Sequence, residues 1–159
     1  MECDTDTSYY YRYLKHPVGV SHIEFEVKAN NDVHIALSPS ENSSDLYEIV
    51  IGGWKNTKSF IRRCQQCTNL ATLATHLYLS ANAFRWFWIN FDSNGTIAVG
   101  RNNESTAFMN WTDPDPLEVQ YLGYSTGFGS IGKFRFFGLG KQSRYLPPIT
   151  CRDRIFEAA

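Results

Sequence analysis

The sequence predicts an all-β fold, namely an antiparallel β-sandwich of jelly-roll-like topology with about ten short strands and little or no helix. Aromatic residues, which favour half-buried pleated surfaces, are abundant, with 4 Trp, 9 Tyr and 11 Phe in 159 residues. Short segments alternate between apolar and polar residues, and turn signals separate them about every 8–12 residues. The length suits one domain spanning residues 1–159.

The first strong strand pattern is Val20–Lys28, in which every second residue from Ile23 onward is apolar and the others are polar. This period of two is typical of a strand with one solvated face. Asn30–Asp32 predicts a turn, because Asn and Asp tolerate left-handed backbone geometry. His34–Ser38 then resumes as a short strand.

A polar loop over Ser38–Asp45 leads to the next two predicted strands, Tyr47–Trp54 and Lys58–Gln65. The pair Gly52-Gly53 closes the first of them. Leu70–Ala81 fits both helical and strand spacing, and we interpret it as a strand because its neighbours are β-like.

Phe84–Asp92 is the most aromatic run and predicts a buried central strand. The turn Ser93–Gly95 contains an Asn-Gly hairpin signal before the strand Thr96–Val99. Ala107–Trp111 predicts a short strand, which ends at the proline-containing loop Thr112–Pro116.

The last strong pair of predicted strands is Glu118–Thr126 and Lys133–Leu139. The tail, Gly140–Ala159, is mixed in character, and we expect it to pack back on the sandwich. The order of the strands cannot be derived from this pattern.

Charge and the length of the apolar stretches each exclude one class of partner. With 15 basic and 16 acidic residues the net charge is −1, whereas a nucleic-acid binder needs a basic surface. A membrane-spanning helix requires about 18 apolar residues, and no apolar stretch approaches this length, so we expect no membrane insertion.

Cysteines and glycosylation signals favour a secreted protein whose leader has been removed, although Met1–Asp4 has no features of a signal peptide. The alternative is a cytosolic protein with incidental signals and free thiols. The even number of cysteines allows two disulfides, as a local bridge or as longer pairings. The candidates for disulfides are Cys3, Cys64, Cys67 and Cys151. The candidates for N-glycosylation are Asn42, Asn94, Asn103 and Asn110.

Catalytic and cofactor motifs are weak. Gly127–Gly132 matches G-x-G-x-x-G, but it lies between two strand patterns, so we interpret it as a hairpin loop. Cys64-Gln-Gln-Cys67 lacks a second ligand pair for zinc and the helix of a redox motif. Asp113 and Asp115 could bind calcium together with Asn110, although this sequence pattern more often forms a proline-stiffened surface loop. We therefore predict no cofactor, no resident metal and no catalytic residue.

The remaining signal is an aromatic recognition surface. Tryptophan faces stack on apolar ring faces, while Asn, Asp and His give directional bonds to hydroxyl groups, and carbohydrate contacts use both. We expect Trp86 and Trp88, which share one strand face, to fill the sandwich. Trp54, beside the Gly-Gly turn, is a stronger candidate for binding.

Several motifs in order resemble the farnesoic acid O-methyltransferase-like domain. They are Phe25–Ser38, Tyr47–Ser59, Phe84–Ile89, Ile97–Gly100 and Asp115–Ser125. The resemblance covers about residues 20–137. The family name implies methyl transfer, yet such domains also occur in secreted, complement-like proteins and beside lectin modules of invertebrates.

The resemblance and the aromatic surface together predict a non-catalytic, lectin-like module of a secreted invertebrate defence or adhesion protein, with glycans as partners. Sugar sites bind weakly, so we expect a homo-oligomer. One alternative is an S-adenosylmethionine-dependent farnesoic acid O-methyltransferase, and another is a protein–protein interaction domain. Within the matched motifs, the predicted carbohydrate-binding residues are Asn31, Asp32, His34, Trp54 and Asn56.

Overall fold

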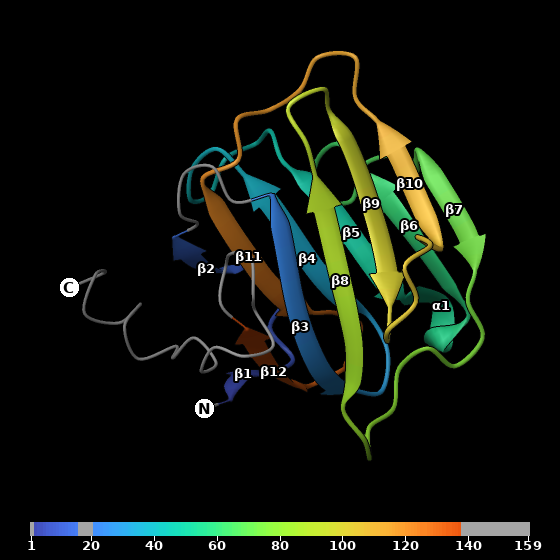
Figure 1. Cartoon of the computed structure of the whole chain (residues 1–159). Coiled ribbons are helices and arrows are strands. Elements are labelled where there is room, and N and C mark those ends of the chain that lie inside the picture. Colours follow the sequence, from blue (N-terminus) through green and yellow to red (C-terminus); the bar gives the residue numbers. More distant parts are fainter. Residues whose placement is uncertain (1, 16–20, 138–159) are drawn as a thin grey trace.

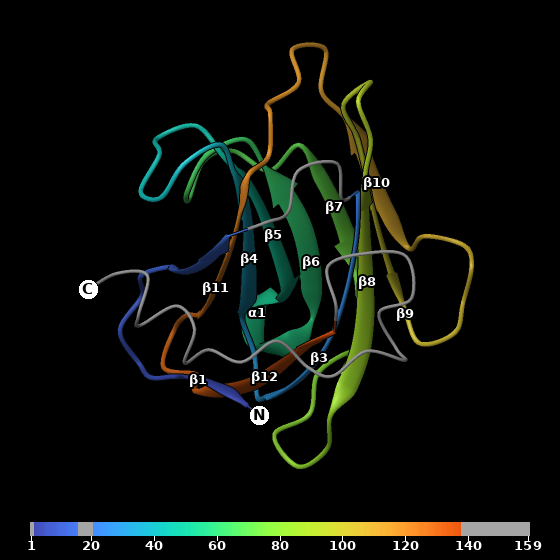
Figure 2. The ribbon, with the colours of Figure 1, turned by 60° about the vertical axis from the view of Figure 1, so that its left-hand side comes forward.

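A computed structural model describes residues 2–15 and 21–137 of the chain. Twelve strands form two six-stranded antiparallel sheets that pack face to face (Figures 1 and 2). The all-β prediction is confirmed. The only helical segment in the described ranges is α1 (Gly53–Asn56), a single turn between two strands.

The first sheet, sheet A, has the strand order β1-β12-β3-β8-β9-β10. Its strands are β1 (Cys3–Thr5), β12 (Gly132–Phe137), β3 (His22–Ala29), β8 (Arg85–Phe91), β9 (Thr96–Arg101) and β10 (Met109–Thr112). The second sheet, sheet B, has the order β2-β11-β4-β5-β6-β7. Its strands are β2 (Arg12–Lys15), β11 (Tyr121–Thr126), β4 (Val33–Ser38), β5 (Tyr47–Gly52), β6 (Lys58–Arg62) and β7 (Ala71–Ala74).

The core lies between the sheets and draws on both of them. In sheet A the alternation seen in the sequence holds, because Ile23, Phe25 and Val27 point inward and are fully buried. Phe25 pairs across the sheet with Phe87 on one side and Phe136 on the other, with ring centroids 5.7 Å apart in each case. In sheet B the inward set includes Val33, Ile35, Leu37, Ile49, Ile51 and Ile61, together with Leu14, Tyr47, Leu122 and Tyr124.

The outer face of sheet B is also buried. The register Ala36↔Glu48↔Arg62 places charged side chains at the middle of this face, and Glu48 is 0% exposed. Tyr11 and Tyr13, which lie before and within β2, pack on the face in a second apolar cluster. The Glu48 carboxylate is therefore enclosed on the outer side of sheet B. The alternation of apolar and polar residues along the strand does not predict this burial.

Several sequence-based boundaries were wrong. β1 and β2 lie before residue 20, where no strand was expected, because apolar alternation is weak there. Leu70–Ala81 forms a strand only over Ala71–Ala74 and then turns, with Leu77 at φ 55°. The strand predicted to begin at Glu118 begins at Tyr121. The tail, Gly140–Ala159, lies outside the described residues.

Trp86 and Trp88 do not fill the space between the sheets, because their strand directs Phe87 into the core and both tryptophans onto the outer face of sheet A. Trp88 is nonetheless buried there. Its indole lies over Gly100 on β9, and its Nε1 donates to the carbonyl of Glu104 at 2.9 Å.

Candidate ligand-binding edge of sheet B

Three turns meet at one end of sheet B. The β3–β4 turn lies in the middle, because the Asp32 N–H donates to the carbonyl of Gly52 at 2.8 Å and its carbonyl accepts from the Gly127 N–H at 3.0 Å. Gly52 leads into α1 and Gly127 leads into the β11–β12 turn. On the latter side the Ser130 hydroxyl also accepts from the Asn31 N–H at 3.4 Å. We call the edge formed by these turns the three-turn edge.

Trp54 projects from the α1 turn. Trp54, Lys55 and Asn56 all have positive φ, at 51°, 58° and 63°, so the turn winds in the left-handed sense that side chains disfavour. Gly52 opens the turn at φ 69°, and a Cβ there would lie 2.5 Å from Leu79 Cδ1. The resulting turn holds the Trp54 side chain away from the protein, where the residue is 69% exposed. Lys58 Nζ lies 5.8 Å from the indole centroid.

Phe128 is a second exposed aromatic residue, in the β11–β12 turn. It has φ 51° and is 74% exposed. Its ring centroid lies 6.3 Å from that of Tyr9. Two aromatic side chains in left-handed turns therefore flank the polar β3–β4 turn.

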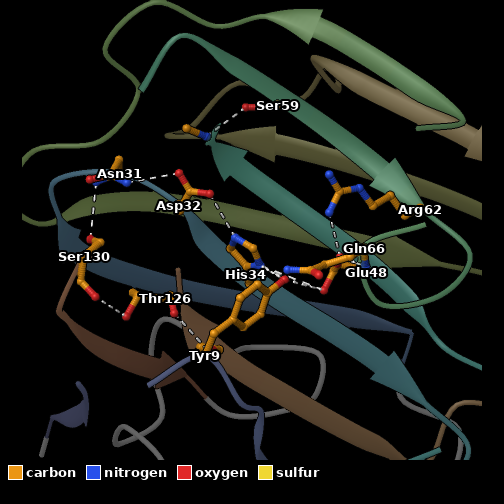
Figure 3. A network of polar contacts seen from close by, with 12 residues as sticks. Tyr9, Asn31, Asp32, His34, Glu48, Ser59, Arg62, Gln66, Thr126 and Ser130 are labelled. Atoms are coloured by element: carbon orange, nitrogen blue, oxygen red, sulfur yellow. Dashed lines mark hydrogen bonds and ion pairs between the residues drawn. The ribbon is translucent and has the colours of Figure 1, made fainter. Parts of the chain in front are cut away.

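The polar groups of the middle turn form a chain of contacts (Figure 3). The Asn31 amide donates to Asp32 Oδ1 at 3.0 Å, and Asp32 Oδ2 lies 3.2 Å from His34 Nε2. On the other side of the imidazole, Nδ1 lies 2.7 Å from the Tyr9 hydroxyl, which donates to Glu48 at 3.1 Å. Burial lowers the pKa of His34, but the hydrogen bond to Asp32 and the Glu48 carboxylate, 3.8 Å from Nδ1, outweigh it and raise the pKa above 6.5.

Glu48 anchors the inner end of this chain. Its carboxylate accepts from the Tyr11 hydroxyl at 2.5 Å, from Arg62 Nη1 at 3.0 Å and from the Gln66 N–H at 2.9 Å. Burial raises the pKa of Glu48, but the His34 imidazole, 3.8 Å away, and the bonds from Tyr11 and Gln66 prevail and bring it to about 2. The sequence offered no signal for this role, because a charged residue within an apolar strand looks like any solvated position.

The structure brings together four of the five predicted site residues. Asn31, Asp32 and His34 are in direct contact, and Trp54 follows Gly52, which pairs with Asp32. Asn56 differs, because it is buried and its side-chain amide donates to the Leu79 carbonyl while its side-chain oxygen accepts from the Leu79 N–H. That side chain secures the α1 turn, whereas Trp54 and Asn31 reach solvent.

The family model described as farnesoic acid O-methyl transferase matches residues 5–138. The chain belongs to this family. The match begins before residue 20, where the sequence resemblance was expected to start. No curated protein matches the sequence of this member of the farnesoic acid O-methyl transferase family.

Thirteen solved chains match the structure of this family member. One is the crystal structure of the galectin LEC-6 from Caenorhabditis elegans, with a TM-score of 0.55 and 11% sequence identity. The alignment covers 82% of this chain and 92% of the galectin chain. At this identity the likeness shows a shared sandwich fold.

Other sequence motifs of the farnesoic acid O-methyl transferase family member have local structural explanations. Gly127–Gly132 spans the turn between β11 of sheet B and β12 of sheet A, so it connects the two sheets, and the predicted hairpin loop was wrong because the two strands do not pair with each other. Asp113 is buried, accepts from the Tyr47 hydroxyl at 2.7 Å and from Arg63 Nε at 2.8 Å, and so ties its loop to sheet B. Among the residues that the structure describes, no cluster of His, Cys, Asp and Glu could hold a metal ion.

Two cysteines form a local bridge, Cys64–Cys67, in the turn after β6. In this turn the Gln66 N–H donates to Glu48, so the disulfide stabilises the turn that covers Glu48 on the outer face of sheet B. Cys3 is buried, and the described part of the chain has no free thiol. Cys151 lies outside that part. No helix within the described ranges has the length and apolar character of a membrane span.

Proposed function

We propose that this chain is a carbohydrate-binding module and that the three-turn edge holds the sugar. The observation that carries the proposal is the Trp54 indole, 69% exposed on a run of left-handed residues beside Asn31 and Asp32. Each left-handed residue other than glycine costs about 1–2 kcal/mol, and an exposed indole returns no burial energy to offset it. Asn56 secures the turn through Leu79, but the exposed Trp54 indole contributes little to the fold, and its display on a strained turn favours a role in binding.

The edge offers both kinds of contact that a sugar needs. The Trp54 face can stack on the apolar face of a pyranose ring, and Phe128 supplies a second apolar surface. Asn31, which reaches solvent, supplies an amide for hydroxyl groups, and the buried Asp32 carboxylate holds that amide in place. Asp32 is fixed on both oxygens by Asn31 and His34, so its position is set before a ligand arrives.

The fold supports the same function. The name galectin denotes a lectin, and the sandwich of LEC-6 is similar to this one over most of both chains. The disulfide fits an oxidising compartment, and we infer that the module belongs to a secreted defence or adhesion protein. A shallow edge binds weakly, so useful avidity requires a homo-oligomer or clustered copies.

A glycan array followed by NMR titration tests this proposal. Trp54→Ala is expected to weaken sugar binding about tenfold or more, as the loss of one stacking contact of about 1.4 kcal/mol implies. Leu73→Ala is the control, because Leu73 is also an exposed apolar side chain of sheet B but lies on β7. Unchanged binding by a folded Trp54→Ala variant would exclude this edge, and no binding at high glycan density would exclude the function.

The family description favours a second candidate function, methyl transfer to farnesoic acid or a related acid. Calorimetric titration with S-adenosylmethionine, alone and with farnesoic acid, discriminates the two functions. Micromolar binding of the methyl donor would favour the enzyme, and a protein that binds sugars but not the donor would favour the lectin.

A further inference from the structure

The outer face of sheet A carries a depression that the proposed sugar edge does not use. Trp86, Phe137, Asn102 and Asn103 line it, and its volume is about 370 Å³. Two of its lining side chains are aromatic and two are amides, which is the mixture of apolar faces and hydrogen-bonding groups that a sugar ring matches.

The aromatic floor of the depression is well defined. Trp86 on β8 and Phe137 on β12 have ring centroids 4.6 Å apart with 31° between their planes, so the two rings lie against each other and form an aromatic pair in the lining of the depression. Trp86 Nε1 donates to Glu24 Oε1 at 3.3 Å, which orients the indole. Both residues are half-buried, so part of each ring faces outward.

The turn after β9 forms the amide side of the depression. The Asn102 N–H donates to the carbonyl of Trp86 at 2.9 Å, and Asn102 adopts φ 55°. This bond holds the turn beside the tryptophan. Asn103 follows in the same turn and is exposed.

Asn103 is also the acceptor of the N-glycosylation sequence Asn103-Glu104-Ser105, and Ser105 is exposed as well. Four such sequences occur in the chain, at Asn42, Asn94, Asn103 and Asn110. Asn103 is the one among them that lines this depression. A sugar attached there would begin its chain at the edge of an aromatic surface.

We propose that Asn103 carries an N-linked glycan whose first sugar packs on Trp86 and Phe137. In the modification, the Asn103 amide nitrogen attacks the anomeric carbon of a lipid-diphosphate-linked oligosaccharide. A carbon–nitrogen bond forms, the carbon–oxygen bond to the diphosphate breaks, the amide loses one proton and the lipid diphosphate leaves. The attached ring then covers apolar surface on the two aromatic residues, which stabilises the folded chain.

This inference is independent of the proposed function. The glycan lies on sheet A and is covalent, whereas the sugar ligand lies at the three-turn edge of sheet B and exchanges with solvent. If the glycan at Asn103 is not found, the proposed sugar binding at the three-turn edge is unaffected, and the reverse also holds.

The test uses the chain fused to a secretory leader and expressed in eukaryotic cells. Mass spectrometry of the purified protein is expected to find a glycan at Asn103. Trimming to the first sugar should keep the melting temperature, whereas Ser105→Ala, which prevents attachment but keeps Asn103, should lower it by about 2–4 °C. In a Trp86→Ala background the same Ser105→Ala change should have no further effect, because the packing surface is gone.

Ser44→Ala is the matched control, because it removes the sequence at Asn42, on a loop of sheet B. Its effect should be the same in the native background and in the Trp86→Ala background. If Trp86→Ala does not fold, nuclear Overhauser contacts between an isotope-labelled first sugar and the Trp86 indole protons decide the point in the native sequence. An unmodified Asn103 in the secreted protein, an equal loss in both backgrounds, or absent contacts to Trp86 would overturn the proposal.

Discussion

The carboxylate of Glu48 and the imidazole of His34 are two ionisable groups buried on the same outer face of sheet B. Each is compensated by named partners, Arg62 and the tyrosine hydroxyls for Glu48, and Asp32 with Tyr9 for His34. The pKa of Glu48 is lowered to about 2 and that of His34 is raised. Glu48 is therefore charged in the fold near neutral pH, and the fold binds the His34 proton more tightly than the unfolded chain does, so the stabilising effects of the two groups have opposite dependence on pH.

For Glu48 the unfolded chain binds the proton more tightly than the fold does between pH 4.5 and 2. The free energy of unfolding should therefore fall as pH falls through this range, by up to about 3 kcal/mol from this group. For His34 the fold binds the proton more tightly, so its contribution is complete below pH 6.5 and is lost as pH rises through the raised pKa. Urea denaturation from pH 2 to 9 measures both slopes.

Glu48→Gln isolates the acid limb of this profile. The variant should be less stable than the native protein at pH 6, because Arg62 and His34 lose their buried counter-charge, and the difference should shrink as pH falls towards 2. Asp113→Asn is the matched comparison, since it removes a different buried carboxylate, which bonds to Tyr47 and Arg63. The two variants together show how much of the acid dependence belongs to Glu48. A constant difference between Glu48→Gln and the native protein at all pH values would contradict the assignment.

At the scale of elements, the contact between β8 and β9 depends on a glycine, Gly100, whose lack of a side chain leaves room for Trp88. A Cβ on Gly100 would lie 2.0 Å from Cε2 and Cζ2 of Trp88, whose indole covers that position. Gly100→Ala is expected to lower the free energy of unfolding by about 1–3 kcal/mol, because the indole must leave its place over β9. Urea denaturation followed by circular dichroism measures the change.

The same substitution in a Trp88→Ala background should cost little, because no ring then occupies the space above Gly100. Gly100 has no positive φ, so the backbone itself accepts alanine. An equal loss of stability in both backgrounds would show that the strand, and not the indole, requires glycine.

The strands that the sequence predicted well are those with one apolar face, such as β3, where Ile23, Phe25 and Val27 repeat with period two. Asn31, Asp32 and Trp54 could be proposed as site residues because turns and their polar residues are visible as a local pattern. Glu48 and the tyrosines that cover it were missed. Their roles come from pairing between segments far apart in the chain, which local periodicity does not contain.

At the scale of the whole molecule, the two sheets share one core. Phe25 and Phe87 from sheet A and Ile35 and Ile49 from sheet B belong to the same buried cluster, so neither sheet keeps an apolar interior without the other. Figure 2 shows the two layers facing each other along their length. This arrangement supports the expectation of a single domain that unfolds as one unit.

A single cooperative transition is therefore expected in urea. Far-UV circular dichroism, which reports both sheets, should give the same midpoint as tryptophan fluorescence, to which Trp86, Trp88 and Trp111 of sheet A contribute. Native-state hydrogen exchange should give the same opening free energy for the amides of Phe25 in β3 and Ile49 in β5, because both open only when the shared core opens. Two separated transitions, or protection lost in sheet B while sheet A remains closed, would mean that the sheets are independent units and that the three-turn edge can open without the rest of the sandwich.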